Sequence, residues 1–364
     1  MAVALLIGLL ACRASAVPIT PTRDDEVIER LPAVSVRNSN SSEPALALRE
    51  AQALLDASRK EGDPRLAGRA LARLARWSQD PQAPAEVLLL LASAEQYLHQ
   101  FDRATARLQA LVQRDPRQAQ AWLVLATMHR VRGRYADSDA ACRALLSLRA
   151  QPYADGCVVE NLALRGEHDA ARRQLQALIA AAADASIRGW LLTTLAELEQ
   201  RAGRVQASEQ AWRRALQAVP DSYTSIGYAD FLLDNQRPRE AWRVLQPQVR
   251  TDPVMLRLAI AAQRAGMAQA TVLQAELRER FALADQRTES SGHERERAMM
   301  ALEIERDPAA ALRVARRNVE HQREPLDVLL LARCAAAAKD DGARNEARQL
   351  ARTMGLRDAR LDAL

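Results

Sequence analysis

The sequence is poor in aromatic residues, glycine and lysine. Phe, Trp and Tyr make up 4% of the 364 residues although 48% of the chain is hydrophobic, so much of the apolar fraction is alanine and leucine. Alanine and leucine are strong helix formers, whereas the β-branched residues that favour strands are sparse. The composition therefore predicts an all-α protein with small residues where its helices approach closely.

Nearly all of the positive charge is arginine, because lysine occurs only at Lys60 and Lys339. The net charge is +5 and the pI is about 9.3. The arginines alternate with alanine, leucine and acidic residues, and they form no long block of like charge. This pattern is typical of a solvated helix face, whereas a nucleic-acid footprint clusters its basic residues. We therefore expect no nucleic-acid partner.

Sequence signatures of catalysis are missing as well. The chain has no P-loop, no G-x-G-x-x-G and no G-x-S-x-G motif. No two of its five histidines have the spacing of zinc ligands, and residues 293–297 read HERER rather than H-E-x-x-H. Acid pairs at helical spacing occur throughout and are typical of salt-bridged surfaces. We expect a protein that is not an enzyme and that binds neither a metal nor a cofactor.

The one long hydrophobic run lies at the start of the chain. Residues 1–16 read MAVALLIGLLACRASA and end in a small-x-small site, which predicts a signal peptide cleaved before Val17. The run is too short for an ordinary membrane span, and no other segment could cross a membrane. The stretch LLAC at 9–12 resembles a bacterial lipobox, so lipidation at Cys12 is the alternative to cleavage before Val17. A third possibility is that neither processing step occurs. We expect an exported bacterial protein, periplasmic or secreted, with a lipoprotein as the alternative.

What the chain does have is a repeated pattern. Residues 17–44 carry Pro, Ser, Asn and Asp without a period and predict a flexible lead-in, and helical periodicity begins at Ala45. Two consecutive stretches of 34 residues then share a Leu-Ala pair at positions 7 and 8, an aromatic residue at 17 and a small residue at 20. The residues concerned are Leu91, Ala92, Phe101 and Ala104 in one stretch and Leu125, Ala126, Tyr135 and Ser138 in the other. The clearest copies fill residues 85–118, 119–152, 189–221 and 222–255, and degenerate copies fill 256–364.

The spacing of these residues predicts two helices that pack closely against each other. Small residues at positions 8 and 20 allow the approach, Gly133 breaks the first helix from the second, and Pro116 closes a unit. The pattern resembles the tetratricopeptide repeat (TPR), and the whole chain resembles exported bacterial TPR proteins without an assigned activity. The resemblance implies a right-handed α-solenoid of helix-turn-helix repeats over residues 45–364. An ordinary helical bundle remains the alternative for 270–364, where the register is poor.

The cysteines add one structural expectation. Cys142 and Cys157 fall on consecutive, packed helices of neighbouring repeats. In an oxidising compartment a disulfide can form between them, and the alternative that the sequence leaves open is two buried free thiols. We expect Cys334 to be a core residue.

The resemblance also implies which residues face the concave side of the solenoid, where the first helix of each repeat lies. The candidate partner-binding residues are Tyr97, Arg130, Tyr153, Glu160, Trp190, Glu197, Arg201, Tyr223 and Asp230. Tyr153, Trp190 and Tyr223 occupy position 2 of three consecutive repeats, and aromatic rings beside charges are typical of interaction hot spots. The alternative is that these rings pack against neighbouring helices and support the solenoid.

We therefore expect a non-enzymatic scaffold of the bacterial envelope that binds a protein or peptide in its concave groove. The second hypothesis is a lipidated structural component of an envelope assembly that uses its convex face or its ends.

Overall fold

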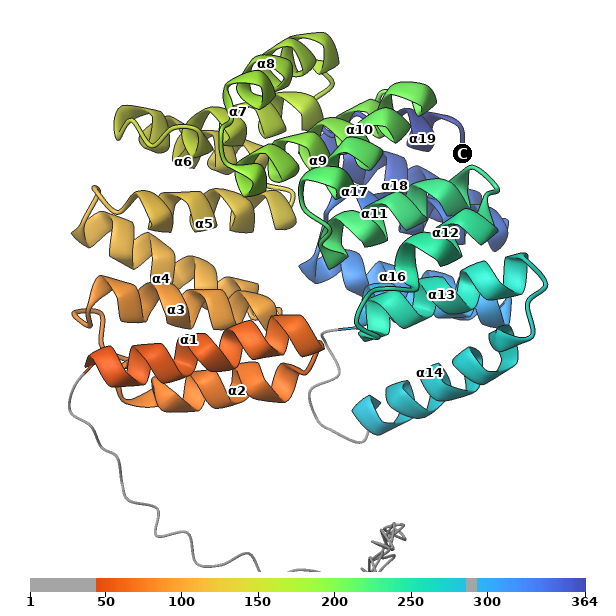
Figure 1. The fold of residues 1–364 in the computed structure, drawn as a ribbon, viewed down its shortest axis with the longest axis horizontal. Coiled ribbons are helices and arrows are strands. Elements are labelled where there is room, and N and C mark those ends of the chain that lie inside the picture. The colour runs from red at the N-terminus through yellow and green to blue at the C-terminus, as the bar shows by residue number, and fades with distance from the viewer. Residues whose placement is uncertain (1–43, 286–292) are drawn as a thin grey trace, which may run out of the picture. The chain divides into compact units, whose positions relative to one another are not determined.

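The helices follow one another as pairs that pack side by side along the chain (Figure 1). The computed structural model describes residues 44–285 and 293–364. The expected signal peptide, Cys12 and all but the last residue of the expected lead-in lie outside the described residues.

Each pair consists of a first helix, a short turn and a second helix. The first helices are α1 (Pro44–Glu61), α3 (Ala85–Tyr97), α5 (Ala119–Val131), α7 (Tyr153–Leu164), α9 (Ala185–Arg201), α11 (Ser222–Asp234), α13 (Asp252–Arg264), α15 (Glu294–Met300) and α17 (Pro325–Ala337). Their partners are α2 (Pro64–Arg73), α4 (Phe101–Arg114), α6 (Tyr135–Ser147), α8 (His168–Ala181), α10 (Val205–Ala218), α12 (Pro238–Leu245), α14 (Gln269–Asp285), α16 (Pro308–His321) and α18 (Asp341–Met354). A 3-10 turn (Ala75–Trp77) follows α2, a π-helical turn (Ala301–Glu305) extends α15, and the short helix α19 (Ala359–Asp362) follows α18.

The expected all-α solenoid is confirmed. Over residues 44–285 and 293–364 the structure contains helices and no strand. Each second helix packs on its own first helix, and α2, α4, α6, α8, α10, α12 and α16 also pack on the first helix of the next pair. The pairing continues through α13–α14, α15–α16 and α17–α18, so residues 293–364 extend the same arrangement.

Glycine forms the turn inside several pairs. Gly133, Gly166 and Gly203 adopt φ values of 69°, 89° and 73° between the first and second helices of three consecutive pairs. A side chain is strained in this left-handed region, which explains why glycine recurs at this position of the sequence pattern. His99 and Gln236 adopt the same conformation in two other pairs, with φ of 58° and 59°.

The helix boundaries follow the sequence pattern closely in some repeats and differ in others. The stretches 85–118 and 119–152 begin where α3 and α5 begin, and each contains one helix pair. The stretch 189–221 starts inside α9, because the Asp184 side chain caps the helix one turn earlier by accepting the Ile187 amide. The stretch 222–255 ends inside α13, because Pro253 lies in the first turn of that helix, where proline is well tolerated, rather than closing the preceding unit.

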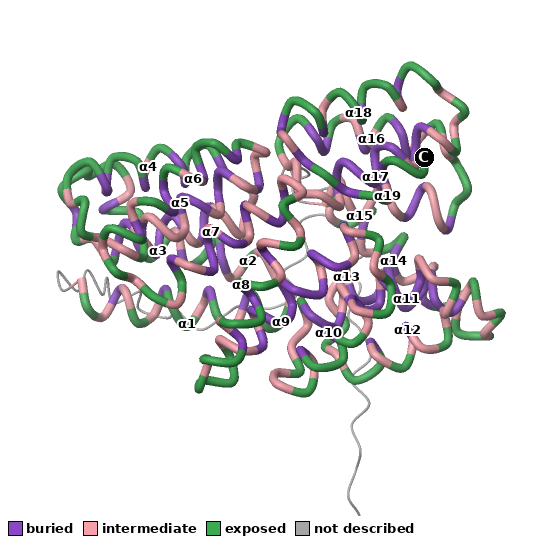
Figure 2. Tube along the Cα trace, turned by 90° about the horizontal axis from the view of Figure 1, so that it is seen from above, coloured by how far each residue is buried: buried purple, intermediate pink, exposed green. Residues whose placement is uncertain are grey.

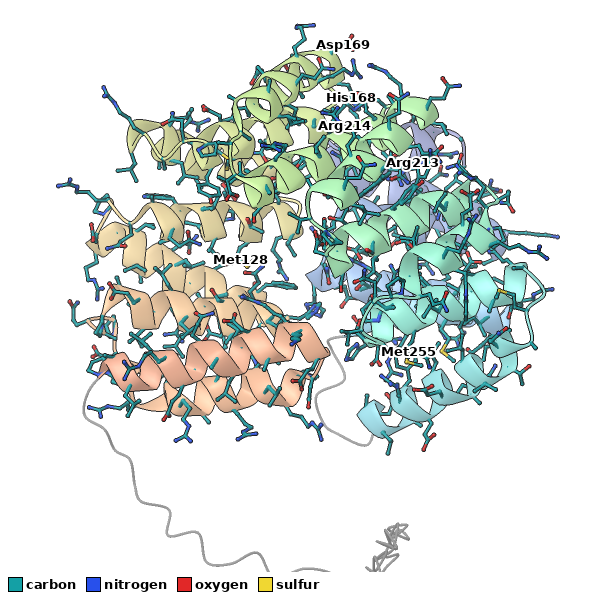
Figure 3. All side chains as sticks on the ribbon, viewed as in Figure 1. Met128, His168, Asp169, Arg213, Arg214 and Met255 are labelled. Carbon is teal, nitrogen blue, oxygen red and sulfur yellow. A yellow bond between two sulfur atoms is a disulfide. The ribbon has the colours of Figure 1, made fainter. Side chains whose placement is uncertain are left out.

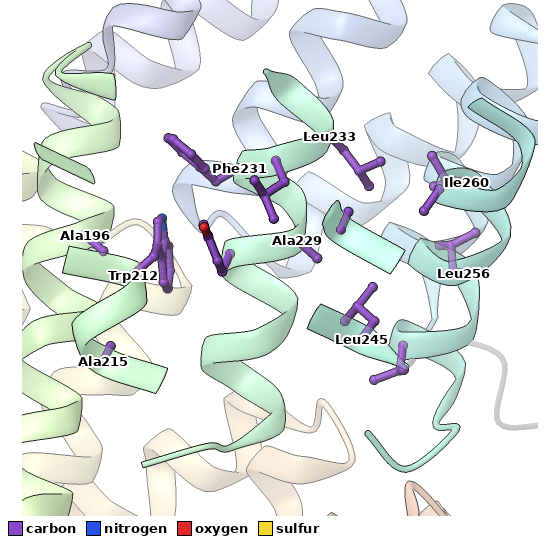
Figure 4. Close-up of a cluster of buried hydrophobic side chains, with 14 of the residues drawn as sticks. Ala196, Trp212, Ala215, Ala229, Phe231, Leu233, Leu245, Leu256 and Ile260 are labelled. Atoms are coloured by element: carbon purple, nitrogen blue, oxygen red, sulfur yellow. The ribbon is translucent and has the colours of Figure 1, made fainter. Parts of the chain in front are cut away.

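Buried residues lie on the helix faces that meet neighbouring helices, and exposed residues face outward (Figure 2). The largest core cluster includes Trp212, which is 1% exposed and lies between α9 and α11 (Figure 4). A Cβ atom added at Gly227 would lie 2.5 Å from Cη2 of this ring, so glycine is what permits the close contact. Close packing of this kind between successive helices holds the solenoid together.

The last helices also contact the turns of much earlier pairs. The Arg323 amide, between α16 and α17, donates to the Val131 carbonyl at the end of α5 over 2.7 Å. Arg132 donates to the His321 carbonyl over 2.9 Å, although the two residues are 189 positions apart. The last pairs therefore pack onto the edge of the solenoid formed by the turns inside the earlier pairs.

Candidate partner-binding face

The three candidate aromatic residues have different surroundings: Tyr153 and Tyr223 lie in the first turns of α7 and α11, whereas Trp190 lies in the second turn of α9. The Trp190 ring packs over Gly156 of α7, where an added Cβ would lie 2.2 Å from Cη2 of the ring. The Tyr153 ring lies beside it, with the ring centroids 5.8 Å apart. Tyr153 is 43% exposed and Tyr223 is 66% exposed. Trp190 thus supports the helix packing, while the two tyrosines present surface to solvent.

Tyr223 is linked to a carboxylate on the neighbouring first helix. Its hydroxyl donates to Glu197 Oε1 over 2.9 Å, and Glu197 Oε2 lies 3.8 Å from the guanidinium of Arg201, one turn further along α9. Burial by the surrounding protein raises the pKa of Glu197, against the lowering effects of Arg201 and of the Tyr223 hydroxyl. The charge of Glu197 raises the pKa of Tyr223 well above its ordinary value. The tyrosine therefore stays protonated and acts as a hydrogen-bond donor.

The candidate charges are paired with other residues of the chain. Arg130 and Glu160 lie 2.9 Å apart. Asp230 accepts two hydrogen bonds of 3.0 Å from Arg257, which is 2% exposed and also lies 3.6 Å from Glu296 of α15. Burial opposes the charge on Arg257, but the two carboxylates outweigh it and raise the pKa of the guanidinium.

The two acids Glu160 and Glu197 lie closer to solvent than their arginine partners. The Glu160 side chain is 25% exposed and that of Arg130 is 11% exposed. The Glu197 side chain is 30% exposed and that of Arg201 is 5% exposed. The carboxylates are therefore the more accessible members of these two ion pairs.

Tyr97 stands apart from the other candidates. Its hydroxyl donates to the Ser58 carbonyl of α1 over 2.9 Å, and its ring packs on the hydrophobic cluster of the first helices. Trp190 packs on a different cluster, which extends from α7 to the π-helical turn.

Sequence reasoning missed Arg257 and Glu296. Neither occupies an aromatic or inward position of a well-formed repeat, and Asp230 and Arg257 are 27 positions apart, which is not the repeat length. Glu197 and Arg201, by contrast, have the i, i+4 spacing at which side chains meet on one helix, so the sequence alone indicates that these two residues form an ion pair.

The cysteines lie where the repeat register places them. Cys142 of α6 and Cys157 of α7 are buried and joined by a disulfide, with their Cα atoms 5.6 Å apart. Cys334 is a buried free thiol, and burial raises its pKa to about 12.

The outer surface carries paired charges. Asp169, at the start of α8, forms ion pairs with Arg172 and Arg204 at 2.6 and 2.9 Å, and Arg213 of α10 binds Glu209 at 2.6 Å (Figure 3). This is the solvated helix face that the alternation of arginine with acidic residues predicts.

The described residues include no group of three or more His, Cys, Asp or Glu side chains placed to hold a metal ion. In the same residues, no helix has both the length and the apolar character that crossing a bilayer requires.

Comparison with known proteins identifies structural neighbours only. No protein-family model matches the sequence, and no curated protein matches it either. A thermophilic TPR protein of Thermus thermophilus is 25% identical, with a TM-score of 0.39 over 52% of this chain and 98% of that chain. The human IFIT1 dimer with m7Gppp-AAAA is 16% identical, with a TM-score of 0.49 over 86% of this chain and 71% of that chain. The TPR domain of P58(IPK) is 14% identical, with a TM-score of 0.26 over 81% of this chain and 98% of that chain. The chain is thus similar to solved TPR structures, while its own helix pairs establish the fold.

Proposed function

We propose that this protein is a non-enzymatic scaffold that binds a peptide segment of a partner protein on the face formed by α7, α9 and α11. The observation that carries the proposal is the exposure of Tyr153 and Tyr223, 43% and 66%, in the first turns of α7 and α11, the first helices on either side of α9. Tyrosine rings bury a large area at small entropic cost and are enriched at interaction hot spots.

The partner segment carries basic side chains. Glu160 and Glu197 are the more exposed members of their ion pairs, so a lysine or arginine of the partner reaches a carboxylate before it meets the arginine beneath. A cation can also lie over the face of a tyrosine ring, which adds about 0.5–1 kcal/mol at an exposed site. A segment with basic residues between apolar ones therefore fits the face better than an acidic segment.

The test replaces the two exposed rings and leaves Trp190, which supports the fold, unchanged. The variant is Tyr153→Ala/Tyr223→Ala, and the matched control is Val272→Ala/Leu283→Ala, which removes two exposed apolar side chains from α14. Loss of a hot-spot ring costs about 2 kcal/mol, so we expect dissociation constants to rise about 30-fold or more in the tyrosine variant only.

The assay is a crosslinked pull-down from the envelope fraction, followed by titration of the captured partner against each variant, with helicity checked by circular dichroism. Equal capture by the wild type and by both variants would move the binding surface to the convex face or to the ends of the solenoid.

We also propose that the protein is exported, as residues 1–16 indicate. The disulfide between Cys142 and Cys157 supports export, because disulfides persist in oxidising compartments. Cell fractionation tests this proposal, and fatty-acid labelling of the wild type and of Cys12→Ser separates a cleaved signal peptide from a lipoprotein. Label that is lost in Cys12→Ser would identify the lipoprotein.

A further inference from the structure

We propose that residues Gly355–Leu364, hereafter the clasp, are a detachable internal ligand, and that the edge of the solenoid that they occupy is a peptide-binding site when they leave. The inference goes beyond the proposed function, and the detachment of the clasp can be tested without any partner.

The clasp runs along the turns of consecutive helix pairs. The Arg357 amide donates to the Leu164 carbonyl at the end of α7 over 2.9 Å. Arg357 also covers Gly166, where an added Cβ would lie 2.7 Å from its Cγ atom. Ala359 covers Gly203 in the next pair, with 3.5 Å between its Cβ and a Cβ placed on the glycine. The clasp thus follows the repeat spacing of the edge as a bound segment would.

Two leucines anchor the clasp. Leu356 and Leu361 are 3% and 5% exposed and belong to the hydrophobic cluster that includes Leu164. Between them, Asp358 accepts hydrogen bonds from the amide and the guanidinium of Arg360. The anchoring side chains are therefore apolar, and the polar ones bind mainly within the clasp itself.

Two features indicate that the clasp can leave while the helix pairs remain. Its helix α19 is only four residues long, which is too short to stay helical alone. A cavity of about 270 Å³ is lined by Ala363 and Leu364 of the clasp and by Gly203, Val205 and Phe231 of the helix pairs. Short segments with incomplete packing open locally at a lower free energy than the core does.

The clasp also brings a positive charge to this cavity. Arg360 and Asp234 both line it, so the guanidinium lies near a carboxylate of α11. Burial opposes the charge of Arg360, but hydrogen bonds with Asp358 and the surrounding carboxylates outweigh burial and raise the pKa of Arg360.

The decisive experiment locks the clasp with a disulfide in the full chain. In Gly203→Cys/Ala359→Cys the two Cβ atoms would lie 3.5 Å apart, at the short end of the range that disulfides require. The native disulfide occupies Cys142 and Cys157, and Cys334 is buried, so the new pair forms apart from them. The reduced double variant and Gly203→Cys alone control for strain at the turn.

Amide hydrogen exchange measures how often the clasp detaches. The Arg357 amide reports the clasp, and the Arg323 amide, bonded to Val131 over 2.7 Å, is the matched control from the loop before α17. We expect Arg357 to exchange at least tenfold faster than Arg323 in the wild type, and to slow to the rate of Arg323 in the oxidised double variant. Equal rates in the wild type would overturn the proposal, because the clasp would then open only with the rest of the fold.

A peptide in trans tests whether the vacated edge is a binding site. The probe is a fluorescent synthetic peptide of sequence GLRDARLDAL, which is the clasp itself. We expect this peptide to bind the reduced double variant at least tenfold more tightly than the oxidised double variant. A peptide with Arg360→Ala should bind the reduced double variant less tightly than the original peptide does. If the peptide binds both forms equally, or binds neither form, the edge is not a binding site. Failure to capture a partner on the tyrosine face would instead count against the proposed function alone.

Discussion

Replacing Gly156 by alanine tests how tightly Trp190 is held against α7. Trp190 Cη2 would lie 2.2 Å from the new Cβ, and Cζ2 and Cζ3 would lie 3.0 Å away, whereas carbon atoms in contact are normally about 3.5–4.0 Å apart. The ring must therefore shift by more than 1 Å, away from a position that it shares with Tyr153. Overpacking of this kind costs about 1–3 kcal/mol.

A second effect has the opposite sign, because alanine is a better helix former than glycine by about 1 kcal/mol. The net prediction is that Gly156→Ala lowers the free energy of unfolding by up to about 2 kcal/mol. Gly68 of α2 provides the control, since an added Cβ there has nothing within 4 Å. Gly68→Ala should raise the free energy of unfolding by about 0.5–1 kcal/mol through the helix preference alone.

Urea unfolding followed by circular dichroism measures both variants, with Trp190→Phe added to each. The smaller ring leaves room for the new methyl group, so we expect Gly156→Ala to cost less in the Trp190→Phe background, while Gly68→Ala is unaffected. The reasoning would be refuted by a Gly156→Ala variant that is stabilised as much as Gly68→Ala, because Trp190 would then not occupy the position described.

Three further predictions concern the charges and the disulfide. Arg257→Ala should lower the free energy of unfolding by about 3–5 kcal/mol, because it leaves Asp230 and Glu296 without their buried cation. Urea unfolding that shows no loss of stability in this variant would contradict the pairing. The raised pKa of Glu197 means that the folded state binds a proton more readily than the unfolded state, so this residue's contribution to stability falls as pH rises from about 4.3 through the raised value. Glu197→Gln should therefore be more stable than the wild type at pH 7 and no different below pH 4, and an unchanged midpoint at pH 7 would count against this account. The disulfide Cys142–Cys157 closes a loop of sequence separation 15, so its reduction should lower the free energy of unfolding by about 3 kcal/mol. Urea unfolding with and without reductant measures this loss. A Cys142→Ser/Cys157→Ser control should show the same stability in both conditions.

Parts of the candidate site could be predicted because their signals are local. The positions of Tyr153 and Tyr223 in the first turns of α7 and α11 follow from the repeat register, as does the approach of Cys142 to Cys157, whereas α9 begins one turn before the register places it. What the register could not distinguish is a ring that supports the packing from one that faces solvent. That difference depends on Gly156, which leaves space for the Trp190 ring, whereas Tyr223 extends toward Glu197.

The sequence by itself determined the helix pairs, their glycine turns and the order in which they pack. Each of these depends on residues within about one repeat of one another, as with Gly133 between α5 and α6. Only the tertiary structure decided which charges pair across repeats, as Asp230 does with Arg257, and that the clasp lies on the turns of earlier pairs. The physical reason is that small rotations between successive pairs add up along a solenoid, so the contact between Leu164 and Arg357 depends on every pair between them.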